Sequence, residues 1–362
     1  MSWLCCEERP LSESPSAAPV PAEPEVGAPR AGLKQWMGAA LGLVVLGLAI
    51  WGLKMIAGQV TVAEIMRDVR DTPTHLIIGA VLFTAMSYVV LVGYDWLATR
   101  HLGYRLPWRT LAAASFASFT MSHTLGVTVL TGGTVRYRIY TRVGVRAADI
   151  AMIILLCGWT FWLGIVAVAG LGLVIAPDLA TPFKNMAPSA ERWAGAILLV
   201  GTLSYLLLAT LWRREFRVFS YRFFIPDGRE TLWQIGIGAV DLAFAGGALF
   251  LLLPDVGVPG ILTFLTIYAV AMVVGALSHS PGGLGVFEGV ILLLMPLAPK
   301  AGVLAALVLF RMIYTYIPFL LGLVVIAVLE WRALRARRLA KRAEVSRLVL
   351  PVPPPPFAAT PE

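Results

Sequence analysis

Long apolar runs are the feature that most constrains this chain. A helix crosses the hydrocarbon core of a bilayer with about 20 apolar residues. Six runs of that size occur, at 36–56, 76–97, 148–175, 193–212, 231–252 and 303–329. Only 14% of the 362 residues are charged, against about a quarter in an ordinary soluble domain. The pattern excludes a water-soluble core and predicts an all-α polytopic integral membrane protein with about six full spans.

Two further apolar regions, 110–135 and 260–298, are interrupted by glycine, proline and polar residues. Cytoplasmic loops carry an excess of Lys and Arg, and arginine clusters flank the first region on both sides. These clusters are Arg100, Arg105 and Arg109 before it, and Arg136, Arg138, Arg142 and Arg146 after it. The first region must therefore enter and leave on the cytoplasmic side. The neighbouring spans place both ends of the second region outside. Each is predicted to be a broken hairpin, either re-entrant or made of two thin crossings.

The order span, hairpin, span thus occurs twice with opposite direction, in residues 76–175 and 231–329. This is the layout of an inverted-topology repeat, which places two interrupted segments near the membrane midplane around a substrate path. A sequence echo agrees with it, because each hairpin carries Ser-His and then a glycine pair. The echo consists of Ser122-His123 with Gly132-Gly133 and Ser278-His279 with Gly282-Gly283. The alternative is a plain helical bundle with two kinked helices.

The ends of the chain differ from its middle in composition. Residues 1–34 are rich in Pro, Ala, Ser and Glu, a composition typical of a disordered tail. Residues 35–330 form the predicted polytopic membrane domain, and 331–362 a basic, then proline-rich cytoplasmic tail. We expect both termini in the cytoplasm. The net charge of +8 lies in short blocks between apolar runs, which indicates topology signals and no nucleic-acid partner.

Ionisable groups at membrane depth are costly to insert, so each is a functional candidate. Asp241 lies in the middle of its span, Glu288 in the second hairpin and Arg311 in the last span. Arg311 can neutralise either carboxylate or meet a lipid phosphate in bidentate fashion. The other interpretation is a buried ion pair that stabilises the bundle. Asp95 is expected to form an interfacial pair with Arg100.

The hairpins also carry candidates for contact with an anionic headgroup. In Thr131-Gly132-Gly133-Thr134-Val135-Arg136-Tyr137-Arg138, the glycines can let the backbone approach a ligand, and freed amides can bind an anion. The two arginines add forks that match phosphate; the alternative is a tight turn followed by topogenic arginines. His123 and His279 sit where each hairpin should turn, as candidates for proton coupling or headgroup contact.

Motifs of hydrolases, transferases and nucleotide-binding proteins are missing from the sequence. We find no serine elbow, no metal-ligand helix and no glycine-rich nucleotide loop before a helix. The three cysteines and four histidines have no metal or disulfide spacing. We therefore expect no catalytic residue, metal or cofactor, and a transport activity that is passive or driven by gradients.

Two segments resemble signatures of one family. They are the segment from Thr131 through Tyr140, with Gly144, and Ser280-Pro281-Gly282-Gly283-Leu284-Gly285-Val286-Phe287-Glu288. The chain resembles, over residues 35–330, the membrane region of the lysylphosphatidylglycerol synthetase/flippase family, also called multiple peptide resistance factor, and its stand-alone membrane relatives. The resemblance carries over Gly132, Gly133, Arg136, Arg138, Pro281, Gly282, Gly283, Gly285 and Glu288 as motif positions.

The resemblance implies a multi-pass protein of the bacterial inner membrane. It implies translocation of phosphatidylglycerol-derived or aminoacylated lipid, and a contribution to resistance against cationic antimicrobial peptides. The aminoacyltransferase domain of two-domain members does not occur in this sequence, so we expect no enzyme activity. We hypothesise that Arg136 and Arg138 receive the phosphate, that Asp241 and Glu288 attract a cationic aminoacyl group, and that Arg311 balances them.

Other functions stay open at this stage. The chain can be the membrane subunit of an aminoacyl-phosphatidylglycerol synthase whose catalytic domain is a separate protein. It can also transport another anionic or amphipathic lipid, or act as a structural partner without transport. The expected partners are a membrane phospholipid, that separate synthase protein and a second copy in a homodimer.

Overall fold

The computed structural model describes residues 61–125, 128–177, 188–211, 215–218, 221–224, 226–278 and 280–348. The predicted first span at 36–56, the tail at 1–34, His279 and the proline-rich end lie outside these residues.

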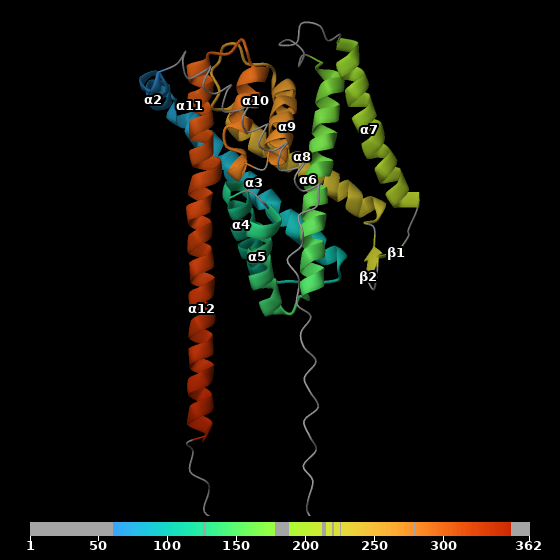
Figure 1. Ribbon diagram of the computed structural model, residues 1–362, viewed down its shortest axis with the longest axis vertical. Helices are drawn as coiled ribbons and strands as arrows, with labels where there is room; N and C mark the ends of the chain where they lie inside the picture. Colours follow the sequence, from blue (N-terminus) through green and yellow to red (C-terminus); the bar gives the residue numbers. More distant parts are fainter. Residues whose placement is uncertain are drawn as a thin grey trace, which may run out of the picture.

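The described chain is built almost entirely from helices (Figure 1). These are α2 (Val62–Asp71), α3 (Thr74–His101), α4 (Trp108–Leu125), α5 (Thr128–Tyr140), α6 (Ala147–Ile175), α7 (Pro188–Leu211), α8 (Gly228–Phe250), α9 (Ile261–Leu277), α10 (Val286–Leu294), α11 (Lys300–Phe310) and α12 (Ile317–Leu348). Short 3-10 turns occur at η1 (Thr141–Val143) and η2 (Pro281–Gly283), and a π-helical turn at η3 (Arg311–Tyr316).

One small element was not predicted. Between α7 and α8, strands β1 (Glu215–Val218) and β2 (Tyr221–Phe224) pair antiparallel. Both segments contain aromatic residues, and β1 also contains the β-branched Val218, and such residues favour extended backbone. The expectation of an all-helical chain is therefore corrected by one hairpin in a connector, and the helical class of the membrane region is confirmed.

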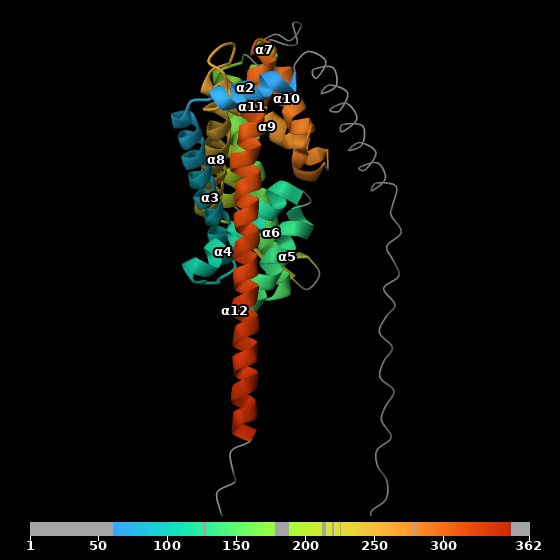
Figure 2. The ribbon, with the colours of Figure 1, turned by 90° about the vertical axis from the view of Figure 1, so that its left-hand side faces the viewer.

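Five helices in the described part of the chain are long and apolar enough to cross a membrane. They are Thr74–His101, Ala147–Ile175, Ser189–Leu211, Gly228–Phe250 and Lys300–Ala336. Each covers all or nearly all of one predicted apolar run, so five of the six runs are confirmed as candidate spans. The last joins α11, η3 and α12 into one helix. It continues beyond the bundle to Leu348, so the basic stretch that starts at Arg332 is helical (Figure 2).

The two interrupted regions form helical pairs at opposite ends of the bundle. α4 and α5 lie in its lower half, whereas α9 and α10 lie in its upper half, and both views agree (Figures 1 and 2). The turn η2 packs against α4. A Cβ added at Gly282 would lie 2.9 Å from the carbonyl oxygen of His123 and 3.0 Å from that of Thr124. The tips of the two pairs therefore touch.

Small residues allow the spans to approach closely, as is common in membrane helix packing. A Cβ added at Gly164 of α6 would lie 2.6 Å from the α-carbon of Gly238 of α8. Two apolar clusters flank this crossing. One includes Phe264 and Leu307 around α9–α11, and the other includes Leu91 and Ile153 around α3, α4 and α6. The buried charges described below lie within this packing.

Candidate functional site

Asp95 and Arg136 form a bidentate ion pair inside the bundle. Arg136 donates from Nε to Oδ1 and from Nη2 to Oδ2, both at 2.9 Å. The hydroxyl of Tyr140 donates to Oδ1 at 2.8 Å, and the guanidinium lies 4.6 Å from the ring centroid of Phe119. The side chains of Arg136 and Asp95 are only 1% and 0% exposed. The expected pairing of Asp95 with Arg100 is wrong, because α5 brings Arg136 against α3.

Arg136 and Arg138 do not share one site. The side chain of Arg138 is 67% exposed and lies 3.6 Å from Glu330 of α12. Arg136 is already engaged by a carboxylate that it shares with Tyr140. Of these two arginines, Arg138 is therefore the one that a ligand outside the bundle can reach. A headgroup role for Arg136 stays a prediction.

Gly132 and Gly133 lie inside α5, so their amides belong to its helical ladder. The expected freeing of these amides for an anion is therefore corrected. Gly132 instead allows close packing, since a Cβ there would collide with Ser122 Oγ and lie 2.8 Å from the carbonyl oxygen of Ser118. Gly132 thus lets the two helices of its hairpin pack closely, whereas Gly133 faces Ile154 of α6.

The second glycine pair has a different conformation. Gly282, Gly283 and Gly285 have φ values of 60°, 66° and 81°, which lie in the left-handed region that glycine adopts without steric cost. The chain therefore turns between α9 and α10 without regular helix. The amide of Gly285 donates to Glu288 Oε2 at 2.8 Å, which fixes one edge of that carboxylate.

Arg311 holds this turn from the neighbouring helix. Its Nε donates to Glu288 Oε1 at 2.6 Å, and its Nη1 donates to the carbonyl oxygen of Gly282 at 2.7 Å. Of the two acids that the sequence offered as partners, Arg311 thus pairs with Glu288. Its Nη2 is buried and has no hydrogen-bond partner among the described residues.

His123 lies at the end of α4, beside the same turn. Its ring stacks on Tyr314 with centroids 5.7 Å apart and an interplanar angle of 24°. Within the described chain, its Nδ1 and the Oγ1 of Thr124 are buried without a hydrogen-bond partner. Together with Arg311 Nη2, these atoms are polar groups at the junction of the hairpin tips that can still form hydrogen bonds with a ligand. His279 lies outside the described residues.

Asp241 of α8 is buried in a network of hydroxyl groups. Ser87 Oγ donates to its Oδ1 at 2.6 Å, and the hydroxyl of Tyr94 donates to its Oδ2 at 3.1 Å. Ser87 Oγ also lies 2.9 Å from the hydroxyl of Tyr314. Sequence reasoning missed these partners. The available signal was the spacing of Ser87 and Tyr94, because residues seven apart share one helix face.

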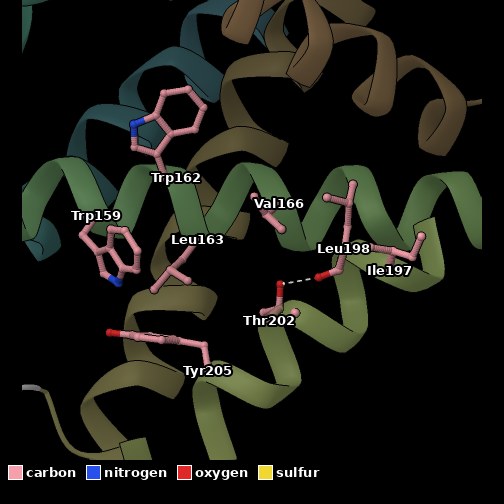
Figure 3. Close-up of a pocket in the computed structure, with 9 residues that line it drawn as sticks. Trp159, Trp162, Leu163, Val166, Ile197, Leu198, Thr202 and Tyr205 are labelled. Atoms are coloured by element: carbon pink, nitrogen blue, oxygen red, sulfur yellow. Dashed lines mark hydrogen bonds between the residues drawn. The ribbon is translucent and has the colours of Figure 1, made fainter. Parts of the chain in front are cut away.

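An apolar groove lies between α6 and α7 (Figure 3). Its volume is about 470 Å³, and its lining includes Trp159, Trp162, Ile197 and Tyr205. The Trp159 and Tyr205 rings meet edge to face, with centroids 5.5 Å apart. The sequence reasoning did not single out these residues, because aromatic and aliphatic side chains are ordinary within apolar spans.

The chain matches one protein family and is similar to two known proteins. Residues 36–322 match the family model described as "Lysylphosphatidylglycerol synthase TM region". The chain is 32% identical over 284 residues to "Uncharacterized protein slr0712" of Synechocystis sp., covering 77% of this chain and 87% of that protein. It is 29% identical over 293 residues to "Inner membrane protein YbhN" of Escherichia coli, covering 79% and 90%.

Proposed function

Because the chain belongs to the lysylphosphatidylglycerol synthase transmembrane-region family, we propose that it moves a phospholipid between the leaflets of a bacterial inner membrane. The proposed substrate is phosphatidylglycerol or its aminoacylated derivative. The contact between the tips of two helical hairpins, with Arg311 and Glu288 beside it, is the observation that carries this proposal. Outward transfer of a cationic lipid would also contribute to resistance against cationic antimicrobial peptides.

The proposed architecture is an inverted repeat with two re-entrant hairpins. One half comprises α3 to α6 and the other α8 to α12. α5 has 13 residues and α10 has 9, whereas a full crossing takes about 20. Both are therefore too short to span, which favours re-entrant hairpins over thin crossings. Such repeats place interrupted segments around a midplane substrate path, and here the junction of the tips would lie on that path.

The charged residues suggest a route for the headgroup. Exposed Arg138 would meet the phosphate first at the cytoplasmic side. At the junction, the unused Nη2 of Arg311 would donate to the phosphate. Glu288 would attract the ammonium group of an aminoacylated lipid. This route needs no metal or bound nucleotide.

The groove between α6 and α7 supports a lipid substrate over a water-soluble one. It is lined by apolar and aromatic side chains from two candidate membrane spans (Figure 3). An acyl chain seated there would remain in an apolar environment while the headgroup passes the polar junction. This separation avoids the cost of transferring the chain into water.

The test uses proteoliposomes that contain only this protein, with fluorescent phosphatidylglycerol and its lysyl derivative. We expect the protein to accelerate movement between leaflets, more for the lysyl lipid. Arg138→Gln should reduce the rate severalfold, because it removes a phosphate fork. Arg229→Gln is the matched control, since it neutralises an exposed arginine at the start of α8. No acceleration of either lipid would contradict the proposal.

A further inference from the structure

Asp241 differs from Asp95 and Glu288 in its partners. Asp95 is held by Arg136 and Glu288 by Arg311. Asp241 is 7% exposed, and it accepts hydrogen bonds from the hydroxyl groups of Ser87 and Tyr94. It lies in the middle of a helix that qualifies as a membrane span. No arginine or lysine in the described part of the chain lies within ion-pair distance of it.

The ionisable side chains around Asp241 on the helices packed against it are tyrosines, namely Tyr88 and Tyr94 of α3, Tyr268 of α9 and Tyr314 of η3. His123 of α4 stacks on Tyr314, and Arg311 begins the π-helical turn that contains Tyr314. Helices α7 and α11 also pack on α8, and their charged residues, Glu191, Arg192 and Lys300, lie at the start of each helix. Arg311 is occupied by Glu288. A permanent negative charge at Asp241 would therefore be balanced by hydrogen bonds alone, which is unfavourable in a medium of low dielectric constant.

Hydroxyl partners suit both protonation states of a carboxyl group. A hydroxyl both donates and accepts, and its hydrogen rotates, whereas a guanidinium only donates. When Asp241 is ionised, Ser87 and Tyr94 donate to it. When Asp241 is protonated, its own O–H can donate to Ser87, which can then donate to Tyr314. The network thus allows proton exchange without leaving a buried group unpaired.

The same network reaches the hairpin junction. Tyr314 lies in the π-helical turn that begins with Arg311, and its ring stacks on His123. The carbonyl oxygen of His123 lies against Gly282 in the second hairpin. π-Helical turns within α-helices are frequent at functional sites. A change in the hydrogen bonds of Asp241 would therefore act on the helix that holds the turn of the second hairpin.

We infer that Asp241 is a proton-binding site that couples lipid translocation to the proton gradient, with one proton moving inward for each lipid moved outward. The inference rests on the proposed function and adds its driving force. In each cycle the carboxylate takes a proton from the outer side as Asp241–COOH and releases it to the cytoplasm. The O–H bond of the Asp241 carboxyl group is the only covalent bond that forms and breaks at this residue in the cycle.

The first test detects the proton without any lipid transfer. Infrared spectra of the protein in nanodiscs should contain a carboxylic-acid C=O band that titrates with pH and is missing in Asp241→Asn. Tyr94→Phe and Ser87→Ala keep the carboxyl group but remove one donor to its charged form. Each should raise the pH at which the band disappears by about one unit, the effect of one hydrogen bond to a charged group.

Thr84→Val is the matched control. Thr84 is a buried hydroxyl residue of the same helix as Ser87, and its Oγ1 has no partner among the described residues. The substitution should leave the band's titration unchanged. The absence of a titrating band in the wild type, or an equal shift in Thr84→Val and Tyr94→Phe, would overturn the inference.

The second test imposes a pH gradient on proteoliposomes that carry fluorescent lysylphosphatidylglycerol. An inward proton gradient should raise the wild-type outward rate severalfold, and a protonophore should abolish the increase. The ratio of rates with and without gradient should fall to one in Asp241→Asn, whatever its absolute rate. A wild type that moves lipid but ignores the gradient would overturn the coupling and leave translocation standing. A wild type that moves no lipid would overturn the proposed function, and with it the coupling, while the infrared titration still decides whether Asp241 binds a proton.

Discussion

Asp95 and Arg136 are both almost fully excluded from solvent, so each depends on the other for charge compensation. Removing water from either group costs several kcal/mol, and a bidentate pair with additional hydrogen bonds offsets most of that cost. Tyr140 supplies such a bond to Asp95, and the face of Phe119 lies against the guanidinium. The cluster therefore links α3, α4 and α5 by charge as well as by packing.

Arg136→Met should destabilise the protein because it leaves Asp95 buried without a counter-charge. Breaking a buried pair in this way costs about 3–5 kcal/mol. Arg138→Met, two residues away at an exposed position, should change stability by less than about 0.5 kcal/mol. Unfolding of both variants in detergent, followed by helical circular dichroism, checks the prediction. Similar stability of the two variants would contradict a structural role for the Asp95–Arg136 pair.

At the scale of elements, the two glycine pairs consist of the same residues but adopt different backbone conformations. Gly132-Gly133 lies within a helix, whereas Gly282-Gly283 has positive φ angles in a turn. The glycine pair alone could not separate these outcomes, because glycine is tolerated in a helix at a penalty of about 1 kcal/mol. Packing against Ser118 and Ser122 decides the first case, and those contacts come from the partner helix.

Gly132→Ala should therefore lower stability despite the higher helix propensity of alanine. The added methyl group collides with Ser122 and with the carbonyl oxygen of Ser118, and overpacking of this kind costs about 1–3 kcal/mol. Gly201→Ala is the control, because Gly201 of α7 has open space around its α-carbon. That change should raise stability by up to about 1 kcal/mol. Thermal unfolding of both variants measures these changes in stability. An increase in stability in both variants would exclude the close α4–α5 contact.

At the scale of the molecule, the length of the apolar runs and the placement of arginines predicted the five described spans and the two interrupted regions between them. Span length follows from bilayer thickness, so sequence alone can identify it. The partners of the buried charges could not be predicted in the same way. Arg311 had two acids within reach along the chain, and Asp95 had a nearby arginine, so only the packed arrangement of helices could select Glu288 and Arg136.

The opposed hairpins make a prediction about sidedness. In a variant with Cys5→Ser, Cys6→Ser and Cys157→Ala, single cysteines are introduced at exposed connectors. Leu297→Cys lies after α10, where the leucine is 78% exposed, and Arg105→Cys lies between α3 and α4. These connectors are at opposite ends of the bundle (Figure 1).

A membrane-impermeant maleimide should label Leu297→Cys in cells with a permeabilised outer membrane. It should label Arg105→Cys only after the inner membrane is disrupted, because the basic loops are predicted to face the cytoplasm. Val256→Cys, at a 70% exposed position between α8 and α9, is the matched control and should behave like Leu297→Cys. If all three positions are labelled from one side, both hairpins enter from the same face. A path that alternates between the two faces through their junction would then be excluded, because both tips would open to one compartment.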